Sequence, residues 1–269
     1  MKHLLYLLKI MGGRPMRQLT RLAALAFVLF CCLQTALAYD FSAVSPSGHT
    51  IYYNIVEGGY QIPRVSVTYP NTSESPWGNI QKPYGNLVLP ETVTYNGTTY
   101  NVAYIGEKAF QGCAGLASVV IPSFVLSINY NSFSGCESLT KVTINSDSIT
   151  SGPYSSGMSL NNIFGSQVTN IVIGPVTTIG SFAFFHCSNL ETVTIPSSVQ
   201  YIGNCAFLNC GSLSRVFISD LTAWCRINFA NETSNPLYQA HHLYLNNSLV
   251  THVSIPNTMT SIKKQANDI

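Results

Sequence analysis

The sequence predicts a β-rich solenoid, a right-handed superhelix of coils of about 23 residues with an amino-terminal β cap. One phrase, Ile-Gly-x-x-Ala-Phe-x-x-Cys, recurs with few substitutions from Ile105, Ile128, Ile179 and Ile202. Within the pairs 105/128 and 179/202 the isoleucines lie 23 residues apart, and the cysteines that follow them keep the same step. A period of roughly 20 to 30 residues with fixed apolar positions is typical of a solenoid, in which each coil buries its apolar face against its neighbours.

Each coil is expected to contain one short strand, and the pattern is clearest in residues 190–212. Leu190, Val193 and Ile195 alternate with threonines, as a strand with one buried face requires. Pro196 ends the strand because it lacks the N–H that a sheet ladder needs. Beyond it, Gly203 is expected to allow a tight corner. The chain predicts such strands, side by side in one parallel sheet, at 87–89, 116–121, 139–144, 168–173, 190–195, 213–218 and 250–255.

The remaining segments define the domain organisation. Residues 39–104 do not repeat, and their alternating apolar and polar residues predict a β cap followed by a hairpin at Asn96-Gly97. The repeats then occupy 105–269 and form one domain with the cap. Two irregular inserts, at about 146–160 and about 221–247, are expected to bulge from one side of the solenoid as loops or small hairpins.

Residues 1–38 have the pattern of a secretory signal peptide. Scattered bases precede an apolar run at 22–32, and a small-residue cleavage site ends at Ala38, so the mature chain is expected to start at Tyr39. Met16 is an alternative start, because a basic region sufficient for a signal follows it. The apolar run is shorter than the roughly 20 residues that span a bilayer, so no membrane span is expected after cleavage. The large Phe30 before Cys31 argues against a lipoprotein.

Charge excludes one class of partner. After cleavage the chain holds 8 Lys and Arg residues against 11 Asp and Glu residues, a net charge of −3. Binding to phosphate backbones requires clustered Lys and Arg, and the mature sequence contains no such cluster. Nucleic acid is therefore not an expected partner. Because charged residues are only 9% of the chain, the surface is expected to consist of Ser, Thr, Asn and Tyr.

Six cysteines remain after cleavage. Cys113, Cys136, Cys187 and Cys210 each follow a repeat phenylalanine by three residues, a position that predicts a stack of small buried thiols rather than disulfides. Cys205 and Cys225 lie outside this stack, and a bridge between them depends on whether the fold brings them together. The sequence has no Cys-x-x-Cys and no Cys/His cluster with ligand spacing, so neither a metal nor a cofactor is expected.

The motif Ile-Gly-x-x-Ala-Phe-x-x-Cys-x-x-Leu-x-x-Val-x-Ile-Pro-x-x-Val resembles the BspA-like class of leucine-rich repeats over about 105–262. The resemblance is specific, because at least seven positions recur in phase. It implies a leucine-rich-repeat superhelix and a secreted or surface-attached protein; several members adhere to host matrix proteins or to other cells. The unit around Trp224 also resembles an irregular unit of that class. Asn129, in place of the repeat glycine, departs from the pattern.

The sequence favours a binding function, in adhesion to an extracellular protein or glycan. The outward side chains of successive strands are expected to form columns across the sheet, with an exposed apolar patch inside a polar rim. In particular, Val172 and Phe217 are expected to be exposed. We hypothesise that the ligand meets this face, with the Trp224 insert at its margin, through Lys141, Asn170, Val172, Thr192, Thr194, Arg215, Phe217, Trp224 and His252.

Two other functions are alternatives. The chain is a structural spacer if it is the repeat region of a larger, truncated surface protein. Catalysis has less support, because the sequence contains neither a nucleophile elbow nor paired carboxylates at a recognisable spacing. His241 and His242, near Cys225 and Asp220, suggest a Cys/His pair, but adjacent residues of a strand point to opposite faces, so a structural role is favoured.

The carboxyl-terminal segment 250–269 predicts one more coil, without a successor. Its ending begins another repeat but lacks the phenylalanine. An uncapped solenoid end offers unpaired backbone groups to any similar edge. End-to-end self-association and a chain shortened from a longer parent are both consistent with this ending. A third possibility is that residues 263–269 fold back as a cap.

Overall fold

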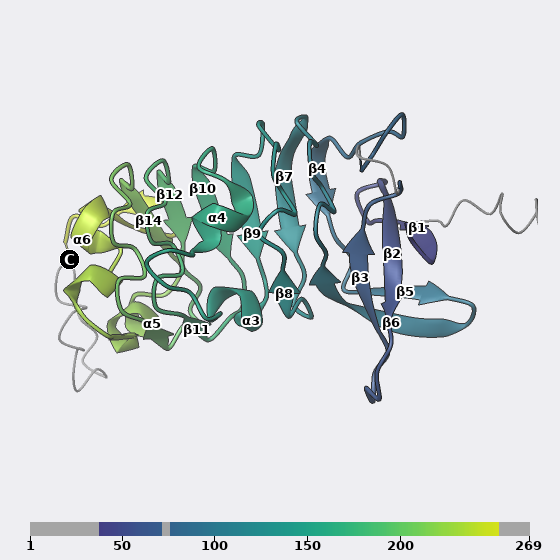
Figure 1. Cartoon of the computed structure of the whole chain (residues 1–269). Coiled ribbons are helices and arrows are strands. Elements are labelled where there is room, and N and C mark those ends of the chain that lie inside the picture. The colour runs from purple at the N-terminus through teal and green to yellow at the C-terminus, as the bar shows by residue number, and fades with distance from the viewer. Residues whose placement is uncertain (1–37, 72–75, 253–269) are drawn as a thin grey trace, which may run out of the picture. The chain divides into compact units, whose positions relative to one another are not determined.

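The computed structural model describes residues 38–71 and 76–252, which belong to one compact unit. The signal-peptide prediction for 1–38 therefore lies, apart from Ala38, outside the described residues. Within the described part the chain forms three sheets of stacked strands, with short helices between them (Figure 1). None of the helices in the described ranges is long and apolar enough to cross a membrane.

The largest sheet has eight strands, in the order β17-β16-β14-β12-β10-β9-β7-β4. Seven of them run parallel, and β17 is antiparallel to β16. This arrangement confirms the strands predicted between residues 87 and 218. The strands are β4 (Gly85–Val88), β7 (Leu116–Ile121), β9 (Lys141–Ile144), β10 (Asn170–Ile173), β12 (Thr192–Thr194), β14 (Arg215–Ile218), β16 (Leu243–Leu245) and β17 (Ser248–Leu249).

Two smaller sheets accompany the eight-stranded sheet, and Figure 1 shows strands β1, β2, β3 and β5 at one end of the stacked units. Strands β11 (Thr178–Ile179), β13 (Tyr201–Ile202) and β15 (Asn228–Phe229) form a parallel sheet in that order. The amino-terminal sheet has the order β1-β2-β3-β6-β5, and β8 pairs with β6. Its strands are β1 (Phe41–Val44), β2 (Thr50–Val56), β3 (Arg64–Thr68), β5 (Thr92–Tyr95), β6 (Thr98–Ile105) and β8 (Ser127–Ile128).

The predicted hairpin at Asn96-Gly97 is confirmed. Strands β5 and β6 are antiparallel, with Tyr95 opposite Thr98. Asn96 and Gly97 between them both have positive φ, 48° and 78°. A two-residue loop of this kind matches the twist of the flanking strands, and Asn-Gly is the pair that adopts it at least cost.

The core is a row of repeat side chains that stack from coil to coil. In β7, Val119 and Ile121 are buried on either side of half-buried Val120, the alternation that one buried face requires, and Leu116 is buried at the start of the strand, where the register with β4 shifts. Phenylalanine rings stack behind the strands: Phe184 and Phe207 lie 5.0 Å apart between centroids. Stacked buried rings contribute about 0.5–1.5 kcal/mol beyond their buried area. A second stack runs through Phe110, Phe133 and Phe164.

Both predicted inserts contain short helices that complete coils, and each also contains a small hairpin, closed by the bridge between Ser155 and Met158 in the first and by β16 with β17 in the second. Between β9 and its parallel neighbour β10, helix α3 (Asp147–Thr150) occupies the position between β8 and β11, and α4 (Leu160–Phe164) supplies Phe164 to the ring stack. Between β14 and β16, the chain forms α5 (Leu221–Arg226), β15, a 3-10 turn (Glu232–Ser234) and α6 (Leu237–Ala240). Helices fit there because each buries apolar residues on one face.

The strand predicted at 250–255 is not found in its described part, because residues 250–252 are outside any strand. The place beside β14 belongs to β16, with Val216 opposite Leu243 and Phe217 opposite Tyr244. Asn246 and Asn247, both with positive φ, then turn the chain into β17. The remainder of the predicted coil, 253–269, lies outside the described residues, and so does the self-association predicted from it.

All six cysteines of the described ranges are free thiols. The four at the repeat position are buried, as predicted, and two of them donate to the preceding coil: Cys136 Sγ to Phe110 O (3.2 Å) and Cys210 Sγ to Phe184 O (3.1 Å). Cys205 and Cys225 do not pair. Cys205 is half-buried beside Thr233, whereas Cys225 is buried in α5.

The repeat glycines have a different role from the one predicted. Gly106, Gly180 and Gly203 do not have positive φ; the left-handed residue comes two positions later, at Lys108, Phe182 and Cys205. Glycine is required because the corner packs on the preceding segment of backbone. A Cβ on Gly106 would lie 2.9 Å from Val67 O, and one on Gly180 would lie 2.9 Å from Ser151 O.

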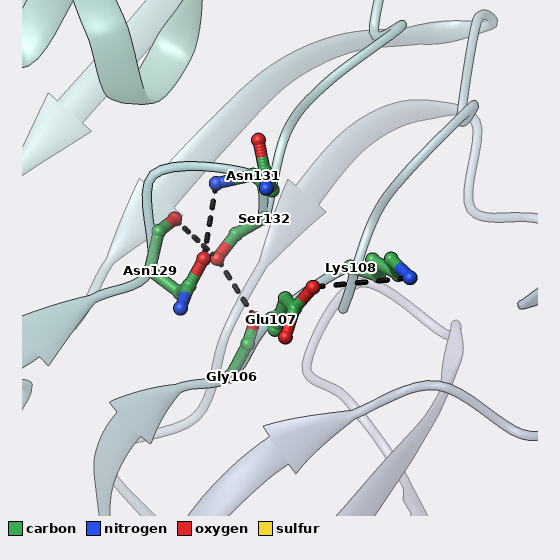
Figure 2. Close-up of polar contacts among 6 residues, drawn as sticks. All are labelled: Gly106, Glu107, Lys108, Asn129, Asn131 and Ser132. Carbon is green, nitrogen blue, oxygen red and sulfur yellow. Dashed lines mark hydrogen bonds and ion pairs between the residues drawn. The ribbon is translucent and has the colours of Figure 1, made fainter.

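The corner that begins with Asn129 is built from polar side chains instead (Figure 2). Asn129 Oδ1 accepts from the Asn131 N–H (3.1 Å), and Asn131 does not have positive φ. Ser132 stands where the other coils have alanine. Its buried hydroxyl contacts the carbonyl oxygens of Asn129 (2.6 Å) and Gly106 (2.8 Å). Two substitutions thus occur together, and the second brings a hydrogen bond to the preceding coil.

Candidate functional site

The outward side chains of the eight-stranded sheet form two columns, because the strands are in register. Lys141, Asn170, Thr192 and Arg215 are direct register partners along the first column. The second column consists of Thr143, Val172, Thr194, Phe217 and Tyr244. Side chains on adjacent strands are about 4.8 Å apart, so one column places four side chains within about 14 Å.

A depression with a volume of about 510 Å³ lies over these columns; we name it the sheet-face groove. It contains seven of the nine residues that the sequence suggested. Its lining residues are Lys141, Asn170, Val172, Thr192, Thr194, Ile195, Arg215, Phe217, Ile218, Ser219, Asn246 and Asn247.

The apolar part of the groove is less exposed than expected. Val172 and Phe217 are half-buried. The Phe217 ring stacks on the ring of Tyr244, with centroids 4.9 Å apart and 29° between the planes. Tyr244 is thereby held beside the groove, although the sequence placed it in an insert. A half-buried pair of aromatic rings suits contact with the apolar face of a sugar or with an apolar side chain.

The charges of the groove are both positive. Lys141 and Arg215 are exposed, and the lining contains no Asp, Glu, His or Cys. The nearest ion pair joins Arg215 Nη2 to Glu191 Oε2 at 3.8 Å, with both side chains about half exposed. An exposed pair of this length contributes about 0–1 kcal/mol, so it holds Arg215 only weakly. Around the cations, Asn170, Thr192 and Thr194 supply amide and hydroxyl groups. The groove can therefore form hydrogen bonds, ring contacts and ionic contacts.

Trp224 was wrongly placed at the margin of this face. Asp220 Oδ1 accepts from the Ala223 N–H and begins α5, which directs Trp224 into the core. There its ring lies against Phe229 in an edge-to-face contact with centroids 5.4 Å apart, and only 1% of the residue is exposed. The large aromatic surface of Trp224 stabilises the irregular coil and does not line the groove.

His252 was also wrongly placed. It is exposed and follows β17, outside any strand. The backbone that continues the column beyond Arg215 is that of His242, whose carbonyl oxygen accepts from the Val216 N–H (3.0 Å). The lining residues that the sequence hypothesis did not include are Ile195, Ile218, Ser219, Asn246 and Asn247, and it also missed Tyr244 beside Phe217. Tyr244, Asn246 and Asn247 could have been found from the sequence, because Leu243-x-Leu245 has the apolar alternation of a strand and begins 27 residues after Val216, which occupies the same position in the preceding coil.

The group of Cys225, His241, His242 and Asp220 is not assembled as a nucleophile and base. Cys225 is buried, and burial raises the pKa of its thiol. No hydrogen bond joins it to either histidine in the described part of the chain. His241, with φ of 56°, ends α6. Among the described residues no cluster of His, Cys, Asp and Glu could hold a metal ion.

Stacked coils with one parallel strand each and a depression across several strands define a leucine-rich-repeat type of protein. The chain belongs to the family described as BspA type leucine rich repeat region, whose model matches in six copies over residues 92–172 and 160–266. These ranges include both intervals that break the period. No curated protein matches the chain significantly.

Several solved structures are similar to the chain. A leucine-rich repeat protein from Bacteroides ovatus is 25% identical over 72% of this chain and 54% of its own, with a TM-score of 0.34. The leucine-rich repeat protein of T. pallidum is 23% identical over 66% and 67%, with a TM-score of 0.36. A leucine rich cell surface protein from Faecalibacterium prausnitzii is 22% identical over 77% and 55%, with a TM-score of 0.36. This chain thus spans about half the length of the first of them.

Proposed function

We propose that this protein is secreted or displayed on the cell surface and binds an extracellular protein or glycan in the sheet-face groove, in adhesion to host matrix or to other cells. The observation that carries the proposal is the groove itself. It gathers two cations, one face of an aromatic pair and a set of amide and hydroxyl groups from four or more separate strands. Membership of a leucine-rich repeat family supports a binding role, because solenoids present extended surfaces to macromolecules.

The proposed export rests on residues 1–38, whose basic region, apolar run and small-residue ending form a signal peptide with cleavage after Ala38. Amino-terminal sequencing of the exported protein tests this directly. Tyr39 is the expected first residue. A protein that keeps its leader after export would contradict it.

We further propose a right-handed superhelix whose first coil is capped by the amino-terminal sheet. Right-handedness is the rule for crossover connections between parallel strands. The cap is supported at β4, the edge strand of the eight-stranded sheet. There the hydroxyl of Ser47 accepts from the Val88 N–H (2.9 Å), and His49 Nε2 contacts Tyr84 O (2.9 Å). Covering an edge in this way prevents its pairing with other chains.

The binding proposal is tested by a screen against matrix proteins and glycans, followed by the double variant Arg215→Ala, Phe217→Ala. We expect at least a tenfold loss of affinity for the ligand found, because both the cation and the ring stack are removed. The control is Arg226→Ala, Tyr238→Ala, which removes one exposed cation and one exposed ring outside the groove. Equal binding by both double variants would exclude the sheet-face groove.

The same screen separates the alternative functions. A chain that binds nothing on the panel would support the spacer, and hydrolysis of a panel substrate would support an enzyme. Self-association through 250–269 stays a prediction, tested by light scattering of the purified chain. Dimers at tens of micromolar that dissociate on removal of 253–269 would support it, and a strict monomer would contradict it.

A further inference from the structure

Neighbouring coils pair their backbones at a third place besides the sheets, in the segment from the repeat phenylalanine to the repeat cysteine, which we name the corner segment. In the first coil, Phe110 N–H donates to Ser132 O (2.8 Å) and Gly112 N–H to Ser134 O (2.7 Å). In a later coil, Phe184 N–H donates to Ala206 O (2.9 Å) and His186 N–H to Leu208 O (3.0 Å). The rule is that N–H groups two residues apart meet carbonyl groups two residues apart in the next coil.

This pairing stops after the corner segment Phe133–Cys136. The next coil approaches with helix α4, whose backbone bonds are largely internal, such as Gly165 N–H to Asn161 O (2.9 Å). The N–H groups of Phe133 and Gly135 consequently have no hydrogen-bond partner in residues 38–71 and 76–252. Beside the corner segment, Gln167 connects the two coils by donating from Nε2 to Cys136 O (3.0 Å), and farther along the coils β9 pairs with β10.

An open groove lies beside these two donors; we name it the intercoil groove. Its volume is about 450 Å³, and it is bounded by the corner segment on one side and by α4 with the following loop on the other. Tyr130, which is 58% exposed, lies at one side of it, and Glu137 is the only charged residue among its lining residues. The corner segment that begins at Phe207 also has no backbone pairing with the coil that follows it in the described chain. The intercoil groove, however, is bounded by the corner segment that begins at Phe133. The gap exists because helix α4 replaces the turn that the repeat would place there.

We propose that the intercoil groove binds a peptide of a partner protein, which takes the place and the turn conformation of the missing corner segment. Carbonyl groups at alternate residues of the peptide accept from Phe133 N–H and Gly135 N–H, as Ser132 O and Ser134 O accept from the first coil. Pairs of backbone carbonyl groups two residues apart are what the next coil supplies at the paired corner segments, and this favours a peptide over a glycan. Glu137 adds a preference for a peptide with a basic residue, because opposite charges across an interface set its specificity.

This site is separate from the sheet-face groove, with which it shares no lining residue. The two proposals therefore fail independently. Loss of binding in the Arg215→Ala, Phe217→Ala variant concerns the sheet-face groove alone.

The first test is amide hydrogen exchange of the free chain, followed by nuclear magnetic resonance. Phe133 and Gly135 are expected to exchange at least tenfold faster than Phe110 and Gly112, their paired counterparts. Equal protection of the two pairs would overturn the proposal, because it would mean that the Phe133 and Gly135 donors are already engaged.

The second test is selection of a random peptide display library on the purified chain. The variant Ser166→Trp places a large ring on one wall of the intercoil groove, and Ser188→Trp is its matched control. Both serines are exposed, lie two residues before a buried repeat position and use no side-chain hydrogen bond in the described chain. We expect peptides that bind the parent and Ser188→Trp chains, bind Ser166→Trp at least tenfold less tightly, and shift the Phe133 and Gly135 amide signals.

The charge preference is tested on the same peptides with Glu137→Gln, which should weaken binding of those that contain Lys or Arg. A library that yields no peptide with the expected sensitivity to Ser166→Trp would overturn the proposal. So would a glycan, and no peptide, that shifts the two amide signals.

Discussion

Gly203 packs directly on Ser181 of the preceding coil. A Cβ built on Gly203 would overlap the backbone nitrogen of Ser181 and lie 2.8 Å from the Gly180 carbonyl carbon. Neither neighbour can move cheaply, because both are backbone atoms. The repeat glycine therefore sets the distance between coils, and this relationship leads to the first prediction.

Gly203→Ala should lower the free energy of unfolding by about 1–3 kcal/mol, since a methyl group is forced into a packed backbone contact. Urea denaturation measures the change. The control is Gly211→Ala, where a Cβ has no neighbour within 4 Å and φ is not positive. That variant should be neutral or more stable by up to about 1 kcal/mol, because alanine restricts the unfolded chain. A Gly203→Ala protein as stable as Gly211→Ala would contradict the close-approach role.

Phe207→Asp should prevent folding at 25 °C. The ring is 0% exposed and stacks on Phe184, so the substitution buries an unpaired carboxylate and removes about 3–5 kcal/mol of packing. Circular dichroism and thermal unfolding measure the outcome. Phe124→Asp, at a phenylalanine that is 45% exposed, is the control and should fold. A cooperative melt for Phe207→Asp near that of the parent would show that the ring stack is not the core.

The polar corner at Asn129 and Ser132 predicts coupling between two positions. Ser132→Ala should cost about 0.5–1.5 kcal/mol, because a buried hydrogen bond to Gly106 O is lost. Asn129→Gly should also destabilise, by loss of the Asn131 contact and by backbone entropy. The double variant restores the residues of the regular coils. Its loss of unfolding free energy should therefore be smaller than the sum of the two single losses by about 0.5 kcal/mol or more. Strict additivity in a double-mutant cycle would show that the two changes are independent.

The buried thiols predict that stability falls in alkaline solution. Burial raises the pKa of Cys136 and of Cys187 to about 12, and it raises those of Cys113 and Cys210 as well. Thiols of the unfolded chain ionise near pH 8.5, so above that pH the folded state binds more protons than the unfolded state. The free energy of unfolding should therefore be constant with respect to these groups below about pH 8 and should decline between about pH 9 and pH 12.

Denaturation at pH 7 and at pH 10 measures this decline, and Cys136→Ala should reduce its slope. A thiol reagent supplies a second measurement at pH 8, where half-buried Cys205 should react before the four buried repeat cysteines. Simultaneous labelling of all of them in the folded chain would contradict their burial.

The repeat strands and most of the sheet-face groove were accessible from the sequence, because side chains at fixed repeat positions occupy fixed places in a stack. Lys141, Asn170, Thr192 and Arg215 were predicted among the contact residues of the sheet face, and strand register places them in one column. The errors concern the irregular coils. Trp224 was expected outside because its segment breaks the period, and it lies in the core.

The sequence by itself determined the family, the inward positions of each regular coil and the absence of disulfides among the repeat cysteines, since all three follow from local periodicity. Only the tertiary structure decided how the irregular segments fit. It placed Tyr244 against Phe217. It also put α4 at the position of a corner segment, so that the N–H groups of Phe133 and Gly135 have no hydrogen-bond partner in the described chain. The reason is physical: a coil must bury its apolar residues and satisfy its backbone against the coils beside it. Helices and strands can both meet that requirement, and only the packed neighbours select between them.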